Sequence, residues 1–456
     1  MKMKQVILWC LLVLIFTSCS NRKKILGERG KPNFIVFIAD DAAWDDCAPY
    51  GNKGIKTPNI NKLADDGLVF NNAFLTTSSC SPSRCSILTG RYPHITGAPE
   101  LHMPLPANQL LFAGELQKVG YYTVAAGKYH IGNPRPEFDT IYGGHPSGCE
   151  YWVEALEKRP KGKPFFMWFA AFDPHRPYEQ NTIPEPHVPA DVTVPPYLPD
   201  NDSTRKDLAL YYDEISRLDN YIGKVMQVLK SQGVDENTLV IYMTDNGRPF
   251  PRCKPRMYGS GIKTPFIVRW PAKVKKGRTD ALVSSIDIAP TLCELADAGI
   301  SGRYQGVSFV PVLEDHSAET RDYIASEHNW HDYQAHERAI CSRNFLYIRN
   351  AFTELNASPP ADAVSSITYQ EMIGMFRAGK LNEFQLDCFI TPRMSEELYN
   401  VINDPYQLNN LAKDPNYNDD LKKMSKLLDD WIIEFDDTIP INPTPDMFDR
   451  VTGEKL

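Results

Sequence analysis

The chain has 456 residues, of which 42% are hydrophobic and 23% are charged, as in an ordinary globular protein. This length exceeds what one small core needs, so we expect a large domain with a smaller appendage, or two domains. The formal net charge of −8 excludes a globally basic surface, so no nucleic-acid partner is predicted. An anionic ligand would need a local cationic pocket.

The N-terminus has the pattern of an export signal. Two lysines precede an apolar run over residues 6–16, which is too short to span a bilayer comfortably. Small residues and then Cys19 follow, as at the processing site of a bacterial lipoprotein; an ordinary cleaved signal with an incidental cysteine is the alternative. We predict a signal peptide over 1–19 and export to the periplasm or an outer-membrane lipid anchor, with no other membrane contact.

Apolar runs alternate with helical patterns in the first two thirds of the chain. The runs occupy residues 33–39, 122–126, 165–172 and 238–244. Continuous hydrophobicity is typical of strands that are buried on both faces. Apolar residues every three to four positions predict helices over 205–230 and 286–298. The order predicts an α/β fold with a mainly parallel sheet, whose active site lies beyond the carboxyl ends of its strands.

The pattern changes near residue 339. Residues 339–341 and 345–349 have the pattern of paired short strands around a turn, and residues 397–401 that of another strand. A helix is expected around 420–435. We therefore predict a smaller C-terminal antiparallel sheet with a helix. The predicted units are an α/β domain at 28–340 and a C-terminal α+β subdomain at 341–456.

Residues 80–91, CSPSRCSILTGR, carry the most specific motif in the sequence. The string resembles the signature of the formylglycine-dependent sulfatases of the alkaline phosphatase superfamily, Cys-x-Pro-x-Arg followed by Thr-Gly-Arg. In that family a maturase oxidises the cysteine to formylglycine, which here would be Cys80. Cys85 is not a target, because no proline follows it two residues later. A buried cysteine at a turn into a helix is the alternative, which the Thr-Gly-Arg string disfavours.

The resemblance implies a mechanism and an alkaline-phosphatase-like fold. The hydrated aldehyde carries two hydroxyls: one attacks sulfur, and the other then loses its proton and expels sulfate as the aldehyde re-forms. Cys80 would sit at a helix N-terminus, where free amides and the helix dipole favour anions. Arg84, one turn later, would hold the nucleophile and help neutralise the metal site.

Two polar pairs directly follow predicted strands: Asp40 with Asp41, and Asp245 with Asn246. Because parallel strands end at one edge of a sheet, these pairs are expected to converge on one ion. Their oxygens and that of modified Cys80 suit Ca²⁺, with Mg²⁺ less favoured. The ion would act as a Lewis acid on sulfate. Either pair alone often forms a turn, but the family resemblance implies these same ligands.

Further residues match basic positions of the family. Lys128 and His130 lie in a Gly-Lys-x-His motif, in which the lysine binds sulfate and the histidine is the base of the release step. His175 resembles the second histidine, a sulfate binder and candidate proton donor to the leaving group. Lys254 has the spacing of the second basic sulfate binder. The chain has Gly-Ser-Gly where many sulfatases have Glu-Gly-Gly, so Arg256 is an alternative binder.

Local strings favour one branch of the family. Residues 78–84, 173–176 and 245–251 resemble heparan N-sulfatase (N-sulfoglucosamine sulfohydrolase) more than arylsulfatases. The resemblance implies an N-sulfated or O-sulfated glucosamine from heparin or heparan sulfate as the substrate, with O-sulfatase action on another sulfated polysaccharide as an alternative.

The segment 326–338 combines His, Glu, Asp and aromatic residues, a mixture that suits a sugar site. It is predicted to follow a strand of the large domain. His328 and His331 are the specificity candidates, with His336 and Arg338 behind them. A polar interdomain loop is the alternative.

Two other functions remain open. A phosphate or phosphonate monoester hydrolase of the same superfamily would want further Asp and His ligands for a second metal, whereas the basic set described above favours the less charged sulfate. A catalytically silent glycan-binding protein would lack a core residue, and the sequence lacks none.

Overall fold

A computed structural model describes residues 30–450 and 452–456 of the chain. The predicted signal peptide at 1–19, with Cys19, lies outside these residues. Among the described residues, no helix has the length and apolar character needed to cross a membrane.

An eight-stranded sheet, in the order β4-β3-β5-β1-β6-β7-β2-β8, forms the centre of the molecule. Its strands are β1 (Asn33–Ala39), β2 (Leu68–Phe74), β3 (Tyr122–Gly127), β4 (Thr140–Tyr142), β5 (Phe165–Ala170), β6 (Thr238–Thr244), β7 (Phe266–Arg269) and β8 (Gly277–Ser284). Only β7 among them pairs antiparallel with its neighbours. The predicted mainly parallel sheet is confirmed, and β1 and β6 have the predicted bounds.

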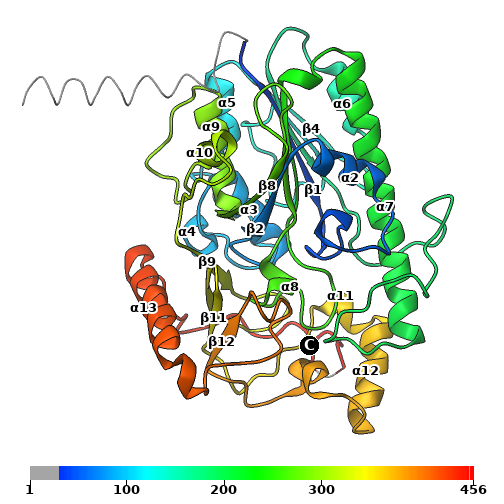
Figure 1. Ribbon diagram of the computed structural model, residues 1–456, viewed down its shortest axis with the longest axis vertical. Coiled ribbons are helices and arrows are strands. Elements are labelled where there is room, and N and C mark those ends of the chain that lie inside the picture. The colour runs from blue at the N-terminus through cyan, green and yellow to red at the C-terminus, as the bar shows by residue number, and fades with distance from the viewer. Residues whose placement is uncertain (1–29, 451) are drawn as a thin grey trace, which may run out of the picture.

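Helices cover both faces of this sheet (Figure 1). One face packs α2 (Pro58–Asp65), α6 (Trp152–Lys158) and α7 (Asp202–Ser231); the other packs α3 (Cys80–Thr89), α5 (Phe112–Lys118), α9 (Ile288–Leu295) and α10 (Val310–Glu314). Alternate side chains of β1 enter the two cores: Phe34, Val36 and Ile38 join the α3 side, while Ile35 and Phe37 join the α7 side. A strand buried on both faces explains the continuous apolar run in the sequence.

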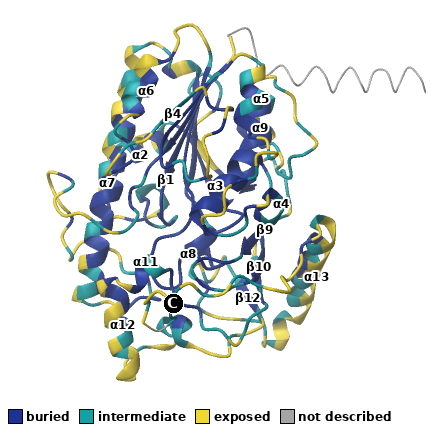
Figure 2. Cartoon of the chain, turned by 180° about the vertical axis from the view of Figure 1, so that it is seen from behind, coloured by how far each residue is buried: buried dark blue, intermediate teal, exposed yellow. Residues whose placement is uncertain are grey.

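A second, antiparallel sheet has the order β12-β11-β10-β9. It consists of β9 (Tyr323–His328), β10 (Glu337–Ser342), β11 (Phe345–Asn350) and β12 (Glu396–Asn400), with α13 (Asn418–Phe435) packed on β10 and β11. This confirms the predicted smaller sheet and helix. In Figure 2 the strands of both sheets are largely buried, and the outer faces of α12 and α13 are exposed.

The second sheet begins earlier than the sequence pattern suggested. A division after residue 340 would cut β10, and β9 pairs with β10 rather than with the central sheet. The strand before the 326–338 segment therefore belongs to the second sheet. β9 contains Ser326 and Glu327, which are buried despite being polar, so no apolar pattern marks this strand. Glu327 N donates to Thr76 O at 2.7 Å, which links β9 to the chain that leaves β2.

Short helices complete the chain. They are α4 (Pro93–Thr96), α8 (Gly259–Ile262), α11 (Ala361–Val364) and α12 (Ile367–Arg377), with 3-10 turns at Ala48–Tyr50, Asp235–Asn237, Ser285–Asp287, Glu383–Gln385, Asp387–Phe389 and Pro415–Tyr417. α12 packs on α7, so the segment after β11 returns to the helical layer of the large sheet.

α13 joins the second sheet to the chain that follows α3, and replacing Trp431 tests this role. Trp431 is 1% exposed and packs edge-on against Tyr92, with ring centroids 5.0 Å apart. Trp431→Ala should lower the free energy of unfolding by about 3–5 kcal/mol, because it empties a packed site. Denaturant unfolding measures this loss. Ile433→Ala, on the same helix at 78% exposure, should change it by less than about 0.5 kcal/mol; equal losses would contradict the assignment.

Candidate active site

Two acidic strand ends meet at one edge of the central sheet. Ala39 of β1 lies beside Thr244 of β6, so the residues after them become neighbours. Asp40, Asp41 and Asp245 are fully buried, and each offers a carboxylate oxygen within 4.8 Å of the others. The backbone N–H of Asp41 donates to Asp245 Oδ1 at 3.2 Å. The structure confirms the prediction that the polar residues after β1 and β6 lie close together.

The donor set at this edge fits a hard divalent cation. Asp40 Oδ1 and Asn246 Oδ1 are buried acceptors without a hydrogen-bond partner among the described residues. The Asn246 amide donates its N–H groups to Asp41 Oδ1 and Gly247 O, which leaves the carbonyl oxygen free. Burial raises the pKa of Asp245 to about 7, opposed by Arg84 and reinforced by Asp40. Unpaired oxygens and crowded carboxylates are what such an ion would satisfy.

Cys80 is the first residue of α3 and lines a cavity together with Lys128 and Lys254. Ser79, the residue before it, gives no side-chain cap to the helix and instead places its hydroxyl 2.7 Å from His331 Nδ1. The first amides of α3 are therefore not capped by that side chain. Burial raises the pKa of the Cys80 thiol to about 11, against the opposing effect of Lys128 and Lys254. An unmodified Cys80 is thus a neutral thiol and a poor nucleophile.

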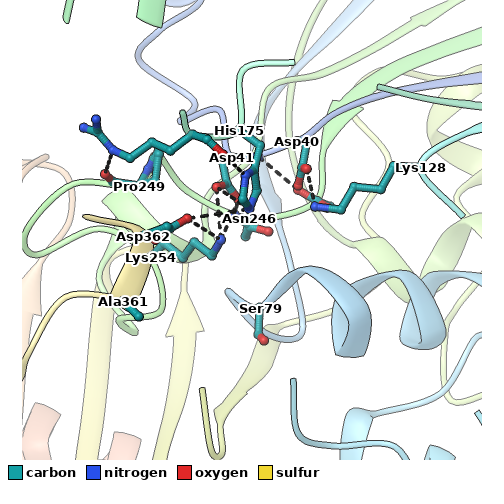
Figure 3. A network of polar contacts seen from close by, with 12 residues as sticks. Asp40, Asp41, Ser79, Lys128, His175, Asn246, Pro249, Lys254, Ala361 and Asp362 are labelled. Carbon is teal, nitrogen blue, oxygen red and sulfur yellow. Dashed lines mark hydrogen bonds and ion pairs between the residues drawn. The ribbon is translucent and has the colours of Figure 1, made fainter. Parts of the chain in front are cut away.

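Each buried carboxylate faces its own cation. Lys128 Nζ donates to Asp40, and Arg84 Nε donates to Asp245 Oδ2 at 2.7 Å. Lys254 Nζ lies 2.9 and 3.0 Å from the two oxygens of Asp41 (Figure 3). Burial alone would raise the pKa of Asp41, but Lys254, and then His175 and Lys128, hold it well below its ordinary value.

Two histidines present ring nitrogens to the same space. His130 Nε2 lies 2.9 Å from His102 Nδ1, and its own Nδ1 has no hydrogen-bond partner among the described residues. Burial, followed by the charge of Lys128, lowers the pKa of His130 to about 2, so this ring is neutral. His175 Nδ1–H donates to Arg176 O at 2.6 Å, which leaves Nε2 facing Asp41 at 3.7 Å.

The loop that carries His175 is fixed to α7 by ion pairs on both sides. Arg176 makes two hydrogen bonds of 2.8 Å to Asp207. Arg217 makes two, of 2.7 and 2.8 Å, to Asp173. Paired guanidinium–carboxylate contacts fix orientation as well as position, so His175 is held between two anchors.

These side chains line one cavity of about 570 Å³. Among the residues that the sequence singled out, it contains Cys80, Lys128, His130, His175, Lys254 and His331. It also contains His102, Leu101, Tyr129, Phe172, Asp332 and Asp362, none of which was a predicted site residue. Of these, Asp332 lies in the 326–338 segment beside His331, whereas Asp362 belongs to no predicted motif or segment and is brought here by the fold.

Four other predicted residues lie elsewhere. Arg256 donates to Glu337 in a buried ion cluster, and His328 Nδ1 lies 3.4 Å from the same carboxylate, so neither lines the cavity. His336 and Arg338 line a separate hollow of about 270 Å³, where Arg338 pairs with Asp437 at 2.6 and 2.8 Å. His328 and Glu337 are register partners on β9 and β10. Arg338, the next residue of β10, points to the opposite face, because successive side chains of a strand alternate.

Comparison with known proteins identifies the family. Residues 32–152 and 148–298 match the Sulfatase family model, and residues 253–349 match the model described as N-sulphoglucosamine sulphohydrolase, C-terminal. The chain is 30% identical to an ulvan-active sulfatase of Formosa agariphila, over 93% of this chain and 81% of that protein. It is 29% identical to N-sulphoglucosamine sulphohydrolase of Homo sapiens, over 98% of this chain and 96% of that protein.

A solved structure supports the same conclusion at the level of the fold. A protein in complex with its substrate D-glucosamine-2-N,6-O-disulfate superposes with a TM-score of 0.70 at 20% identity, covering 90% of this chain and 99% of that one. The predicted alkaline-phosphatase-like α/β fold is confirmed. The chain belongs to the sulfatase family.

Proposed function

We propose that this sulfatase hydrolyses sulfate esters or sulfamates of sulfated glycans, with N- or O-sulfated glucosamine saccharides of heparin or heparan sulfate as the leading class. One observation carries the proposal: Cys80, at the N-terminus of a helix, lines one cavity with Lys128 and Lys254, and these two lysines pair with two of three clustered buried carboxylates. The match of residues 253–349 and the similarity to the human sulphohydrolase support the choice of glucosamine.

The nucleophile in this proposal is Cys80 after oxidation to formylglycine by a maturase. Hydrated formylglycine supplies the hydroxyl that attacks sulfur and the second hydroxyl whose proton loss releases sulfate. Arg84 holds Asp245 and the backbone of Lys128 in place near Cys80, because its guanidinium donates to the Asp245 carboxylate and to the carbonyl of Lys128. The proposal needs the oxidised residue, because a thiol lacks the pair of hydroxyls that attacks sulfur and then releases sulfate.

A divalent cation completes the site, with Ca²⁺ preferred and Mg²⁺ less favoured. Asp40, Asp41, Asp245 and Asn246 would hold it, together with the modified Cys80. When bound, the cation supplies positive charge to a sulfate oxygen as a Lewis acid. Oxygen ligands of this kind, three of them carboxylates, favour a hard ion over a transition metal.

The remaining charged residues handle sulfate and protons. Lys128 and Lys254 are the donors to the sulfate oxygens, because both residues line the cavity beside Cys80. Neutral His130 accepts the proton of the release step. His175 gives a proton to the leaving group from Nε2 of its doubly protonated ring, while its Nδ1–H stays engaged with a backbone carbonyl. His331, beside Ser79, is the specificity candidate that reaches the cavity.

The second candidate is a phosphate or phosphonate monoester hydrolase of the same superfamily. Asp41, His175 and Asp362 are close enough to hold a further metal. Lys254 lies among them, 2.9 Å from Asp41 and 3.6 Å from Asp362. An ammonium ion there contributes one positive charge where a second metal would contribute two. This balance suits a sulfate monoester, which carries one negative charge, better than a phosphate monoester dianion.

The N-terminal sequence supports a proposal for where in the cell the enzyme acts. Export through residues 1–19 places the enzyme in the periplasm or, if Cys19 is lipidated, at the outer membrane. Sulfated saccharides and the maturase are its partners, and the lipid is its membrane contact.

Modification of Cys80 is the first test. Co-expression with a maturase should convert Cys80 to formylglycine, as seen by mass spectrometry of its peptide. Cys80→Ala should lower turnover of a sulfated glucosamine by about 10⁴-fold or more, with an unchanged circular dichroism spectrum. Cys85→Ala, on the same helix and equally buried, should keep both modification and turnover. Near-wild-type turnover in Cys80→Ala would refute the nucleophile.

Calcium binding gives a readout that is separate from turnover. Ca²⁺ should raise the melting temperature of the wild-type enzyme, because it binds the folded state alone. Asn246→Ala removes one oxygen ligand and should weaken Ca²⁺ binding at least about tenfold by calorimetry. Asn72→Ala, whose amide donates to a backbone carbonyl of β8, should bind as tightly as wild type. Equal affinity in both variants would exclude the proposed ligand.

Paired rates on a sulfate ester and a phosphate ester of one alcohol separate the two candidate activities. The sulfate ester should be preferred by more than about tenfold in kcat/KM, a barrier difference of about 1.4 kcal/mol. A tenfold preference for the phosphate or phosphonate would reverse the assignment.

A further inference from the structure

Asp362 lines the catalytic cavity without belonging to any of the motifs described above. It lies in α11, well after the catalytic residues in sequence, and comes from the segment that follows β11. Its Oδ2 lies 3.6 Å from Lys254 Nζ and 3.6 Å from His175 Nε2. Figure 3 shows it approaching Asp41 and Lys254 from the side opposite Lys128. The acid thus stands beside two proposed sulfate-binding cations.

The carboxylate of Asp362 retains unused acceptor capacity. Its two ion-pair distances of 3.6 Å are longer than a hydrogen bond. Its Oδ1 is buried and has no hydrogen-bond partner among the described residues. A carboxylate accepts several hydrogen bonds, and the side chain is 23% exposed although Oδ1 is buried. A ligand donor would therefore meet this carboxylate at Oδ2, whose two long cation contacts leave acceptor positions open.

Burial places Asp362 nearer the entrance than the reacting residue. Cys80 is 2% exposed and the side chain of Lys254 is 2% exposed. The side chains of Asp362 and His175 are 23% and 30% exposed. The sulfate group must reach Cys80 at the bottom of the cavity. The sugar ring to which it is attached therefore lies nearer the entrance. Asp362 therefore faces the sugar more than the sulfur.

The position of Asp362 is fixed from two sides. Asp332 Oδ2 accepts a hydrogen bond of 2.9 Å from Ala361 N, the residue before it. On α12, Thr368 donates at 2.7 Å to Asp207, the same carboxylate that holds Arg176 beside His175. Asp207 therefore ties the α11–α12 segment to the His175 loop. A recognition residue needs this kind of support to discriminate between ligands.

We propose that Asp362 determines which sulfated sugar the enzyme accepts: its carboxylate receives hydrogen bonds from hydroxyl or amine donors on the sulfated ring, and its charge rejects a ring with its own carboxylate. The proposal rests on the glycan sulfatase function and narrows it to neutral and amino sugars, against sulfated hexuronic acids. A site built to accept a donor discriminates strongly against a group that cannot donate.

Substrate preference tests the proposal. The probes are N-sulfoglucosamine, glucosamine 6-O-sulfate and a 2-O-sulfated hexuronic acid, each assayed by released sulfate. Wild-type enzyme should prefer the better glucosamine by about 100-fold or more in kcat/KM. Asp362→Asn should lower kcat/KM on that sugar by roughly 10- to 100-fold, the effect of weakening a charge-assisted hydrogen bond. Asp362→Asn should not lower kcat/KM on the hexuronate. The ratio of kcat/KM between the glucosamine and the hexuronate should therefore fall by more than tenfold.

A matched variant controls for removal of one negative charge. Glu371 is exposed on α12, one helix beyond Asp362. Glu371→Gln should leave both rates within about twofold of wild type. Solvent screens an exposed charge that does not line the cavity, so its loss has little effect on the reaction. Asp362→Glu retains the charge and should keep the direction of the preference.

The outcomes separate this inference from the function on which it rests. If the wild type cleaves none of the three sugars, the proposed glycan class fails and the inference with it. If the wild type prefers the hexuronate, or if Asp362→Asn folds and keeps the wild-type ratio within twofold, the inference alone is overturned. Should Asp362→Asn fail to fold, the wild-type preference together with Asp362→Glu still decides between these results.

Discussion

Three carboxylates buried at the ends of β1 and β6 are the constraint on which the site depends. Burying a charge costs several kcal/mol unless a partner compensates it. The partners come from three different segments: Arg84 from α3, Lys128 from the chain after β3 and Lys254 from the chain after β6. Satisfying Asp40, Asp41 and Asp245 therefore requires these segments to converge. The same requirement brings the N-terminus of α3 to face the strand ends.

The long helix α7 fixes the opposite wall. Its residues Asp207 and Arg217 hold the His175 loop. Its Tyr211 hydroxyl lies 3.1 Å from Asp41 O and accepts from Ala43 N at 3.3 Å. Asp41 has a left-handed backbone conformation with φ of 66°, which costs a non-glycine residue about 1–2 kcal/mol. Packing of α7 against the sheet offsets that strain, so a helix without a catalytic motif controls the geometry of the acidic edge.

The sequence was informative wherever local pattern decides structure. Apolar runs ending in polar residues located β1 and β6, and the parallel register then brought Asp40 and Asp245 together without further information. The motif around Cys80 located the helix start. Arg256 shows the limit: it was the alternative to Lys254 as a sulfate binder, but its side chain pairs with Glu337 of β10, about 80 positions away. Local spacing does not reveal which of two acceptable partners a buried arginine will meet.

No sequence motif marks Asp362, because its place in the cavity depends on the tertiary fold. Its position shows that the two sheets contribute different parts of the site. The residues that would react with sulfate follow strands of the large sheet, where register fixes them. His331, Asp332 and Asp362 come from connections of the second sheet. Loops tolerate substitution better than strand ends whose charges must balance. A second sheet that supplies one wall of the cavity therefore lets recognition of the sugar vary while the buried carboxylates, and the cations that pair with them, stay unchanged.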